Sequence, residues 1–255
     1  MKTIPFRQAL RFLALGTFLI LLPACQPSDG KKNIRAYYFP LDELKEGLVY
    51  EYESVGNDSL QSVYWYYRSL YQEEGVFLTG TNYGQYPGLG LVPMQFVREE
   101  MISDGMLLAD LYLYETDSSG KQQQVPVEKI VDTAFPFEVS EDGGIFLYKV
   151  KWTPWSDSLS TITLIKNRRY LRDTSITFRG KTHQAVLFEV KELLEHNHQE
   201  EGYFEQQFNG VEVYAKNIGL FSYKKVIGDA FTLAYQLKAR YPMEQLEAKV
   251  RQELE

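Results

Sequence analysis

Apolar and polar residues alternate along much of this chain, and such alternation over four to eight residues predicts a β-strand with one buried face. In residues 48–53, Leu48, Tyr50 and Tyr52 share one side of the chain. Residues 145–152 alternate in the same way. Further segments of strand character lie at 62–70, 76–79, 92–102, 106–116, 160–166, 185–193, 203–208 and 231–237. The pattern predicts a mostly β fold.

Short turn signals separate these segments and indicate an antiparallel arrangement. Gly56-Asn57-Asp58, Asp104-Gly105 and Asp117–Lys121 are examples, and Asp-Gly between apolar runs is typical of a hairpin. Residues 121–144 are more polar, so we expect one weak strand and a long connection there. This stretch would be the seam if the fold has two β subunits.

The spacing of the apolar residues changes from two to three or four at the end of the chain. Met243, Leu246, Val250 and Leu254 recur at intervals of three and four residues after Pro242, which suits a first helical turn. The pattern predicts a short terminal helix over about 242–254 that packs its apolar stripe on the sheet.

Residues 1–25 have the layout of a secretory signal peptide. Three basic residues precede an apolar run over 12–22, which at about eleven residues is shorter than the roughly 20 that a membrane span needs. Leu22-Pro23-Ala24-Cys25 follows and resembles the lipobox of bacterial lipoproteins, although Pro23 departs from the usual pattern. The alternative is an ordinary secretory signal with Cys25 incidental.

The lipoprotein resemblance implies removal of residues 1–24 and lipidation of Cys25, the only cysteine of the chain. A diacylglyceryl and an N-acyl group such as palmitate would then anchor the protein to a membrane. Gln26 is not the aspartate that marks inner-membrane retention, which implies the outer membrane of the cell envelope, on its periplasmic or outer face. Residues 25–36 would form a flexible tether and residues 37–255 the β-rich domain.

A second resemblance concerns residues 175–241. Ile176-Thr177 with Gly180-Lys181, followed by the turn Tyr214–Leu220, is similar to a group of uncharacterised β-rich bacterial lipoproteins. Their curved sheet resembles the half-barrel of the lipoprotein carriers LolA and LolB. The resemblance implies an antiparallel curved sheet or half-barrel, and it implies no activity, because fold does not determine function.

The balance of charge excludes one class of partner. Residues 1–24 hold three of the 27 Lys and Arg residues and none of the 34 acidic ones, so the body has a formal charge of −10. Such a body is unsuited to nucleic acid, whose binding depends on cations facing phosphates.

Candidate chemistry is sparse. The chain contains no Gly-x-Ser-x-Gly elbow and no phosphate-binding loop, and a Cys-His pair is excluded because Cys25 belongs to the anchor. We therefore predict no catalytic residues and no cofactor. His196 and His198 would project to the same side of an extended segment and are candidate metal ligands. The favoured interpretation is a solvated hairpin turn.

Three other features could bind a partner or ligand. Residues 82–90 combine three glycines with a proline and predict an irregular loop. Lys166, Arg168, Arg169 and Arg172 form a basic cluster, expected at a solvated hairpin end. The aromatic runs at 64–67 and 152–155 could stack on sugars, but in a strand some of the first run must be core.

Two function classes follow, with an enzyme third. The first is a non-enzymatic binding or scaffold module that joins an envelope protein through an edge strand, the 82–90 segment or an aromatic face. The second is a carrier that holds an apolar ligand, such as a lipid or acyl chain, in a half-barrel. A metal-dependent enzyme would need His196 and His198 beside a cleft.

Overall fold

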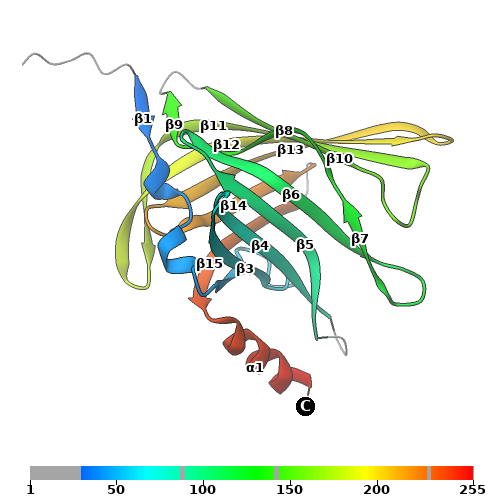
Figure 1. Ribbon diagram of the computed structural model, residues 1–255, viewed down its shortest axis with the longest axis horizontal. Helices are drawn as coiled ribbons and strands as arrows, with labels where there is room; N and C mark the ends of the chain where they lie inside the picture. The colour runs from blue at the N-terminus through cyan, green and yellow to red at the C-terminus, as the bar shows by residue number, and fades with distance from the viewer. Residues whose placement is uncertain (1–29, 87–89, 141–143, 229–230, 255) are drawn as a thin grey trace, which may run out of the picture.

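The computed structural model describes residues 30–86, 90–140, 144–228 and 231–254, which form an antiparallel β structure with one α-helix at the end (Figure 1). The strands are β1 (Lys31–Asn33), β2 (Leu48–Ser54), β3 (Val63–Gln72), β4 (Gly75–Tyr86), β5 (Gly90–Met101), β6 (Gly105–Thr116), β7 (Gln122–Pro126), β8 (Glu128–Pro136), β9 (Glu138–Ser140), β10 (Ile145–Trp152), β11 (Ser160–Phe178), β12 (Lys181–His198), β13 (Gly202–Ala215), β14 (Gly219–Ile227) and β15 (Phe231–Tyr241). Two 3₁₀ helices, η1 (Arg35–Tyr37) and η2 (Leu41–Leu44), precede β2, and α1 covers Met243–Leu254.

The main sheet closes on itself. Its thirteen strands follow the order β5-β4-β3-β2-β15-β14-β13-β12-β11-β10-β8-β6-β7, and β5 also pairs with β6, so that all of them except β7 form a ring. The expected half-barrel is therefore wrong in extent, because the sheet curves until β5 and β6 form a ladder. The strands before and after residues 121–144 belong to the same sheet, since β8 lies between β6 and β10.

One pairing joins the two ends of the chain. β15 lies beside β2 with Tyr241 opposite Val49 and Tyr235 opposite Ser54. Neighbouring strands in the ring are otherwise mostly consecutive hairpins, as the turn signals predicted. The β11–β12 hairpin turns at Arg179 and Gly180, both with positive φ (50° and 75°), which the tight turn requires.

The segment before β2 fills one part of the barrel. Ile34, Tyr38 and Leu44 are buried in the main core, and Tyr38 contacts the ring of Phe135. Phe39 lies against Gly219, where a Cβ would come within 2.6 Å of its ring. Residues 31–36, expected to belong to a flexible tether, are instead part of the fold, because β1 pairs with β9 and η1 follows it.

Helix α1 covers part of the outer surface of the ring, as its apolar stripe predicted. Leu246 and Val250 pack with Val49 and Tyr241 in a second buried cluster. Glu51 lies under the same helix and accepts hydrogen bonds from Tyr241 (2.6 Å) and Lys249 (2.9 Å). This cover explains why both faces of β2 are buried although its sequence alternates.

Two expectations for local structure are wrong. Residues 82–86 belong to β4 and residue 90 begins β5, so the described part of the 82–90 segment is a paired hairpin and not an irregular loop. The basic cluster lies within the 19-residue strand β11, not at a hairpin end. In both places the ladder to neighbouring strands outweighs a local composition that favours turns.

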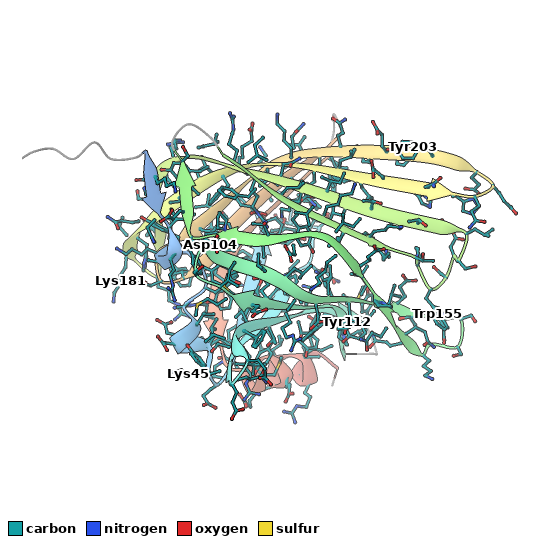
Figure 2. The ribbon with its side chains drawn as sticks, turned by 45° about the horizontal axis from the view of Figure 1, so that its top comes forward. Lys45, Asp104, Tyr112, Trp155, Lys181 and Tyr203 are labelled. Atoms are coloured by element: carbon teal, nitrogen blue, oxygen red, sulfur yellow. The ribbon has the colours of Figure 1, made fainter. Side chains whose placement is uncertain are left out.

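The two longest hairpins turn at opposite ends of the barrel, β11–β12 next to Lys181 and β12–β13 next to Gly202. Figure 2 shows Tyr203 and Trp155 on one side of the molecule and Lys181 and Lys45 on the other. Across the residues that the structure describes, no helix has the length and apolar character needed to cross a membrane.

Candidate functional site

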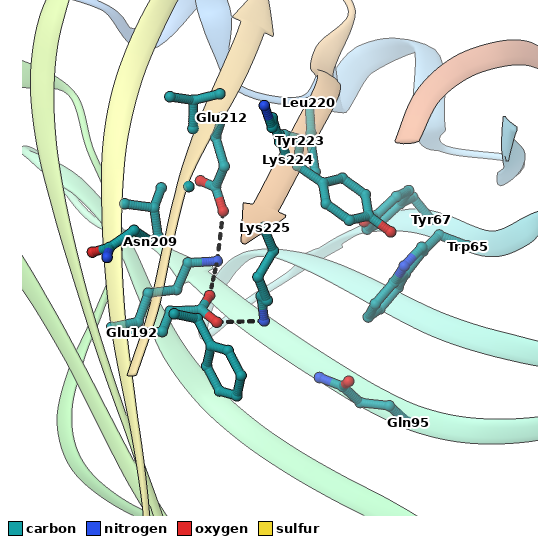
Figure 3. Close-up of a pocket in the computed structure, with 15 residues that line it drawn as sticks. Trp65, Tyr67, Gln95, Glu192, Asn209, Glu212, Leu220, Tyr223, Lys224 and Lys225 are labelled. Carbon is teal, nitrogen blue, oxygen red and sulfur yellow. Dashed lines mark ion pairs between the residues drawn. The ribbon is translucent and has the colours of Figure 1, made fainter. Parts of the chain in front are cut away.

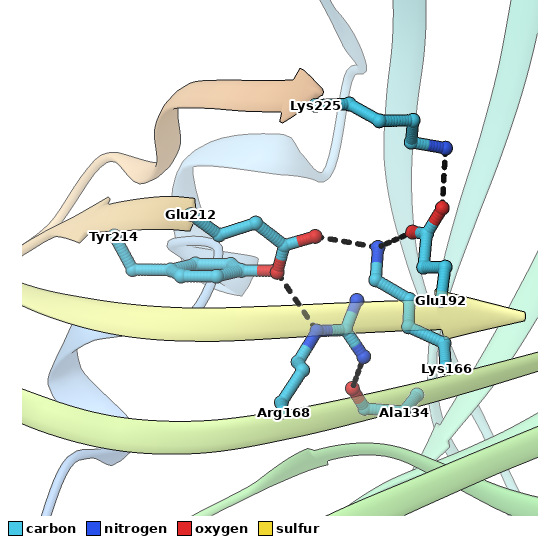
Figure 4. A network of polar contacts seen from close by, with 7 residues as sticks. All are labelled: Ala134, Lys166, Arg168, Glu192, Glu212, Tyr214 and Lys225. Carbon is cyan, nitrogen blue, oxygen red and sulfur yellow. Dashed lines mark hydrogen bonds and ion pairs between the residues drawn. The ribbon is translucent and has the colours of Figure 1, made fainter. Parts of the chain in front are cut away.

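A chain of alternating charges lies inside the barrel (Figure 4). Lys166 of β11 contacts Glu192 of β12 at 3.1 Å and Glu212 of β13 at 2.5 Å. Arg168 donates from Nε to Glu212 at 2.8 Å, and Lys225 of β14 pairs with Glu192. The order along the network is thus Lys225, Glu192, Lys166, Glu212 and Arg168.

Strand geometry explains why these five side chains meet. Lys166 and Arg168 are two residues apart on one strand and so project to the same face. Lys166 lies opposite Glu192 in the β11–β12 ladder. Cross-strand neighbours of opposite charge attract, and here four adjacent strands contribute them to one surface.

The surrounding protein keeps the two carboxylates ionised. Burial opposes the charge of Glu212, but the positive charges of Arg168 and Lys166 outweigh it and hold the pKa of this carboxyl well below its usual value. For Glu192, burial is again outweighed, by Lys166 and Lys225, and the pKa is lowered. Tyr214 donates a further hydrogen bond to Glu212 at 3.2 Å.

A cavity separates this network from an aromatic wall (Figure 3). Its volume is about 310 Å³, near the lower end of the roughly 300–1,000 Å³ of small-molecule sites. Trp65 and Tyr67 face the network from β3, and their rings are stacked with centroids 5.6 Å apart. Gln95 of β5, Asn209 of β13, and Tyr223 and Lys224 of β14 add further polar lining.

A second compartment of about 260 Å³ adjoins the first, because both are lined by Trp65, Lys166 and Glu212. Its inner wall includes Glu99, which accepts a hydrogen bond from Tyr38. Burial raises the pKa of Glu99, and the Tyr38 hydrogen bond and the charge of Arg168 offset this only in part.

The aromatic run at 64–67 divides between two surfaces. Trp65 and Tyr67 line the cavity, whereas Tyr64 and Tyr66 pack with the cluster under α1. Trp155 is exposed on a loop and so lies away from the cavity.

His196 and His198 lie on β12, on one side as expected, with ring centroids 6.4 Å apart. His196 Nε2 is 2.6 Å from Ser160 Oγ, and the Ser160 hydroxyl also bonds to Asp157. His198 Nδ1 accepts backbone hydrogen bonds from the following turn. Within the described ranges no group of three or more His, Cys, Asp or Glu side chains could hold a metal. The contacts of the two histidines join the β12–β13 turn to the start of β11.

The sequence reasoning found part of this site. Lys166 and Arg168 were recognised as a basic cluster but placed in solvent, and Glu212 and Lys225 were not singled out. The signal present in the sequence was the spacing of the charged residues. Lys166 and Arg168 are two residues apart, so in a strand both project to the same face. Cys25 lies outside the described residues.

Comparison with known proteins gave similarities of structure alone. No protein-family model and no curated protein matches the chain. A crystal structure of a candidate lipoprotein from Parabacteroides distasonis has a TM-score of 0.46 and 11% identity over 79% of this chain and 95% of that chain. A candidate exported protein with a YmcC-like fold from Bacteroides fragilis has the same TM-score and the same identity, over 80% of this chain and 98% of that chain. Because the structural similarity and the sequence identity are both low, any conclusion about function is based on the chemistry of the site.

Proposed function

We propose that this chain is a non-enzymatic binding protein that holds a small ligand inside its barrel while anchored to the bacterial cell envelope. The observation that carries the proposal is the cavity between the stacked Trp65 and Tyr67 rings and the Lys166 network. A concave site with aromatic walls and a few fixed polar groups is the usual form of a small-molecule site.

Ring closure favours this function over a scaffold that docks through an edge strand. Each strand of the ring has a neighbour on both sides over part of its length, but β11 beyond Arg169 and β13 before Phe208 are paired on one side only. Among the described strands of the main sheet, β7 alone ends the order. An envelope protein partner could therefore use β7 or these two strand ends, whereas the closed part of the ring is paired on both sides.

The charged wall also argues against a carrier of a wholly apolar ligand. An alkyl chain in the cavity would cover Lys225 and the outer side of Glu192 without offering them a hydrogen bond. Covering polar groups in this way costs free energy unless a partner replaces the lost water. The cavity suits a ligand with both a polar and an apolar part.

The anchor is part of the proposal and rests on residues 1–25. Lipidation at Cys25 would place the barrel at a membrane surface, with the outer membrane favoured by Gln26. Feeding cells an alkyne-bearing palmitate analogue should label the chain, and Cys25→Ser should abolish the label. Equal labelling of the two chains would contradict lipidation at this residue.

Native mass spectrometry of the full-length protein, extracted from envelope membranes in detergent, tests ligand binding. We expect an adduct that is lost on denaturation and is depleted in Gln95→Trp, which places a large side chain in the cavity lining. A bare protein mass both before and after incubation with an envelope extract would overturn the proposed function.

A further inference from the structure

The solvent exposure of the side chains differs along the interior network. The side chains of Glu192 and Glu212 are only 5% and 7% exposed, whereas that of Lys225 is 35% exposed. Figure 3 shows the Lys225 ammonium at the border of the cavity, across from Trp65. A ligand that enters the cavity therefore meets a cation before it meets either carboxylate.

Each carboxylate oxygen of the network already has a cationic partner. Glu192 pairs through Oε1 with Lys166 and through Oε2 with Lys225. Glu212 pairs through Oε1 with Lys166 and through Oε2 with Arg168, and Tyr214 donates to Oε2 as well. A cationic ligand at either carboxylate would lie close to these internal cations, whose like charge opposes its binding.

Lys225 differs because its ammonium has three N–H donors. In the described part of the chain its one ion pair is with Glu192, and its other close contact is the ring of Phe208, 5.2 Å from Nζ to the centroid. An anionic group can therefore add to Lys225 without breaking the network. The amide of Gln95 lies on the same cavity and can donate a second hydrogen bond.

The wall opposite supplies the apolar contact. Trp65 and Tyr67 are nearly parallel, with an interplanar angle of 6°, and Trp65 is half-buried at the cavity. A flat ring can continue this stack, whereas a thin alkyl chain would leave most of the indole face uncovered. Leu220 adds an aliphatic surface beside it.

We infer that the ligand is an amphipathic organic acid whose carboxylate pairs with Lys225 and whose flat apolar body stacks on Trp65. This inference rests on the proposed function, since it names the ligand class of the same cavity. Glu99 lines the adjoining compartment, where its carboxyl accepts a hydrogen bond from Tyr38.

Three probes with one ring system test the inference: 2-naphthoate, 2-naphthalenemethanol and 2-naphthylmethylamine, which are anionic, neutral and cationic at pH 7. Binding to the full-length protein in detergent is measured by equilibrium dialysis against protein-free detergent, which corrects for partitioning. We expect 2-naphthoate to bind at least about tenfold more tightly than the other two, the effect of one charged hydrogen bond.

Lys225→Met should remove this preference, and Lys225→Arg should retain it. Lys191→Met is the matched control, because Lys191 is an exposed lysine of β12 that lies outside the cavity lining. Circular dichroism at the dialysis temperature verifies that each variant is folded.

Equal binding of the three probes, or a preference that survives Lys225→Met, would overturn the ligand class and leave the proposed function standing. The same holds if no probe binds to a protein that carries an adduct from the envelope. Failure of the proposed function itself is a separate result, namely a bare mass in the native spectrum.

Discussion

Lys166 Nζ lies 2.5 Å from Glu212 Oε1 inside the barrel, and both side chains are largely withdrawn from solvent. Removing one partner of such a pair leaves an uncompensated charge in a medium of low polarity. The interior network should therefore matter for stability as well as for binding.

Glu212→Gln keeps the shape of the side chain and removes its charge, so that Arg168, which also donates to the backbone carbonyl of Ala134, loses its anionic partner. We expect the free energy of unfolding in urea to fall by about 3–5 kcal/mol. Glu128→Gln is the matched control, because Glu128 pairs with Lys151 on the surface at 3.9 Å, and an exposed pair contributes about 0–1 kcal/mol. Equal losses in the two variants would refute a special role for the interior pair.

Acid should weaken the same network. The pKa of Glu192 in the folded protein is lowered below its ordinary value of 4.5, so its charged form stabilises the fold fully above that pH. This contribution is lost as pH falls through the folded pKa. The difference in unfolding free energy between the native protein and Glu192→Gln should shrink when urea titrations move from pH 7 to pH 3. A difference that stays constant would show that Glu192 is not the titrating group.

Glu99 should behave in the opposite sense. Its folded pKa is raised above 4.5 because burial disfavours the charged form. The stabilising contribution of the protonated carboxyl is complete below 4.5 and is lost as pH rises through the folded pKa. Glu99→Gln, which can still accept the Tyr38 hydrogen bond, should gain stability relative to the native protein between pH 4.5 and pH 8. A relative loss over that range would contradict the assignment.

Gly210 allows β13 and β14 to approach closely. A Cβ at this position would lie 2.0 Å from the carbonyl oxygen of Lys224, which belongs to the backbone and cannot rotate away. Gly210→Ala should cost about 1–3 kcal/mol and accelerate amide exchange in β14, because the two strands must separate. Gly144→Ala serves as the control, since its nearest neighbouring atom, on Phe146, is 4.0 Å away. Unchanged exchange in β14 would argue that the ladder absorbs the methyl group elsewhere.

Alternation along the chain was a good guide to individual strands. Residues 145–152 were expected as a strand and form β10, and the common side expected for Tyr50 and Tyr52 is the core side. The terminal helix was predicted within a residue at its start. These features depend on near neighbours, whose spacing the sequence displays directly.

Long-range pairing was outside the reach of that reasoning. Nothing local indicates that Tyr241 lies opposite Val49, or that β5 has partners on both sides and so closes the ring. The misplacement of Lys166 and Arg168 followed from this gap. A run of cations is usually solvated, and only the arrival of Glu192 and Glu212 from neighbouring strands makes its burial favourable.

By itself, the sequence determined the mostly β character, many of the strands and the terminal helix, because each is written in the spacing of nearby residues. The tertiary structure decided the closure of the ring and the cavity between Trp65 and Lys225. Those depend on pairings between distant segments, where backbone hydrogen bonding and the neutralisation of buried charge are satisfied together.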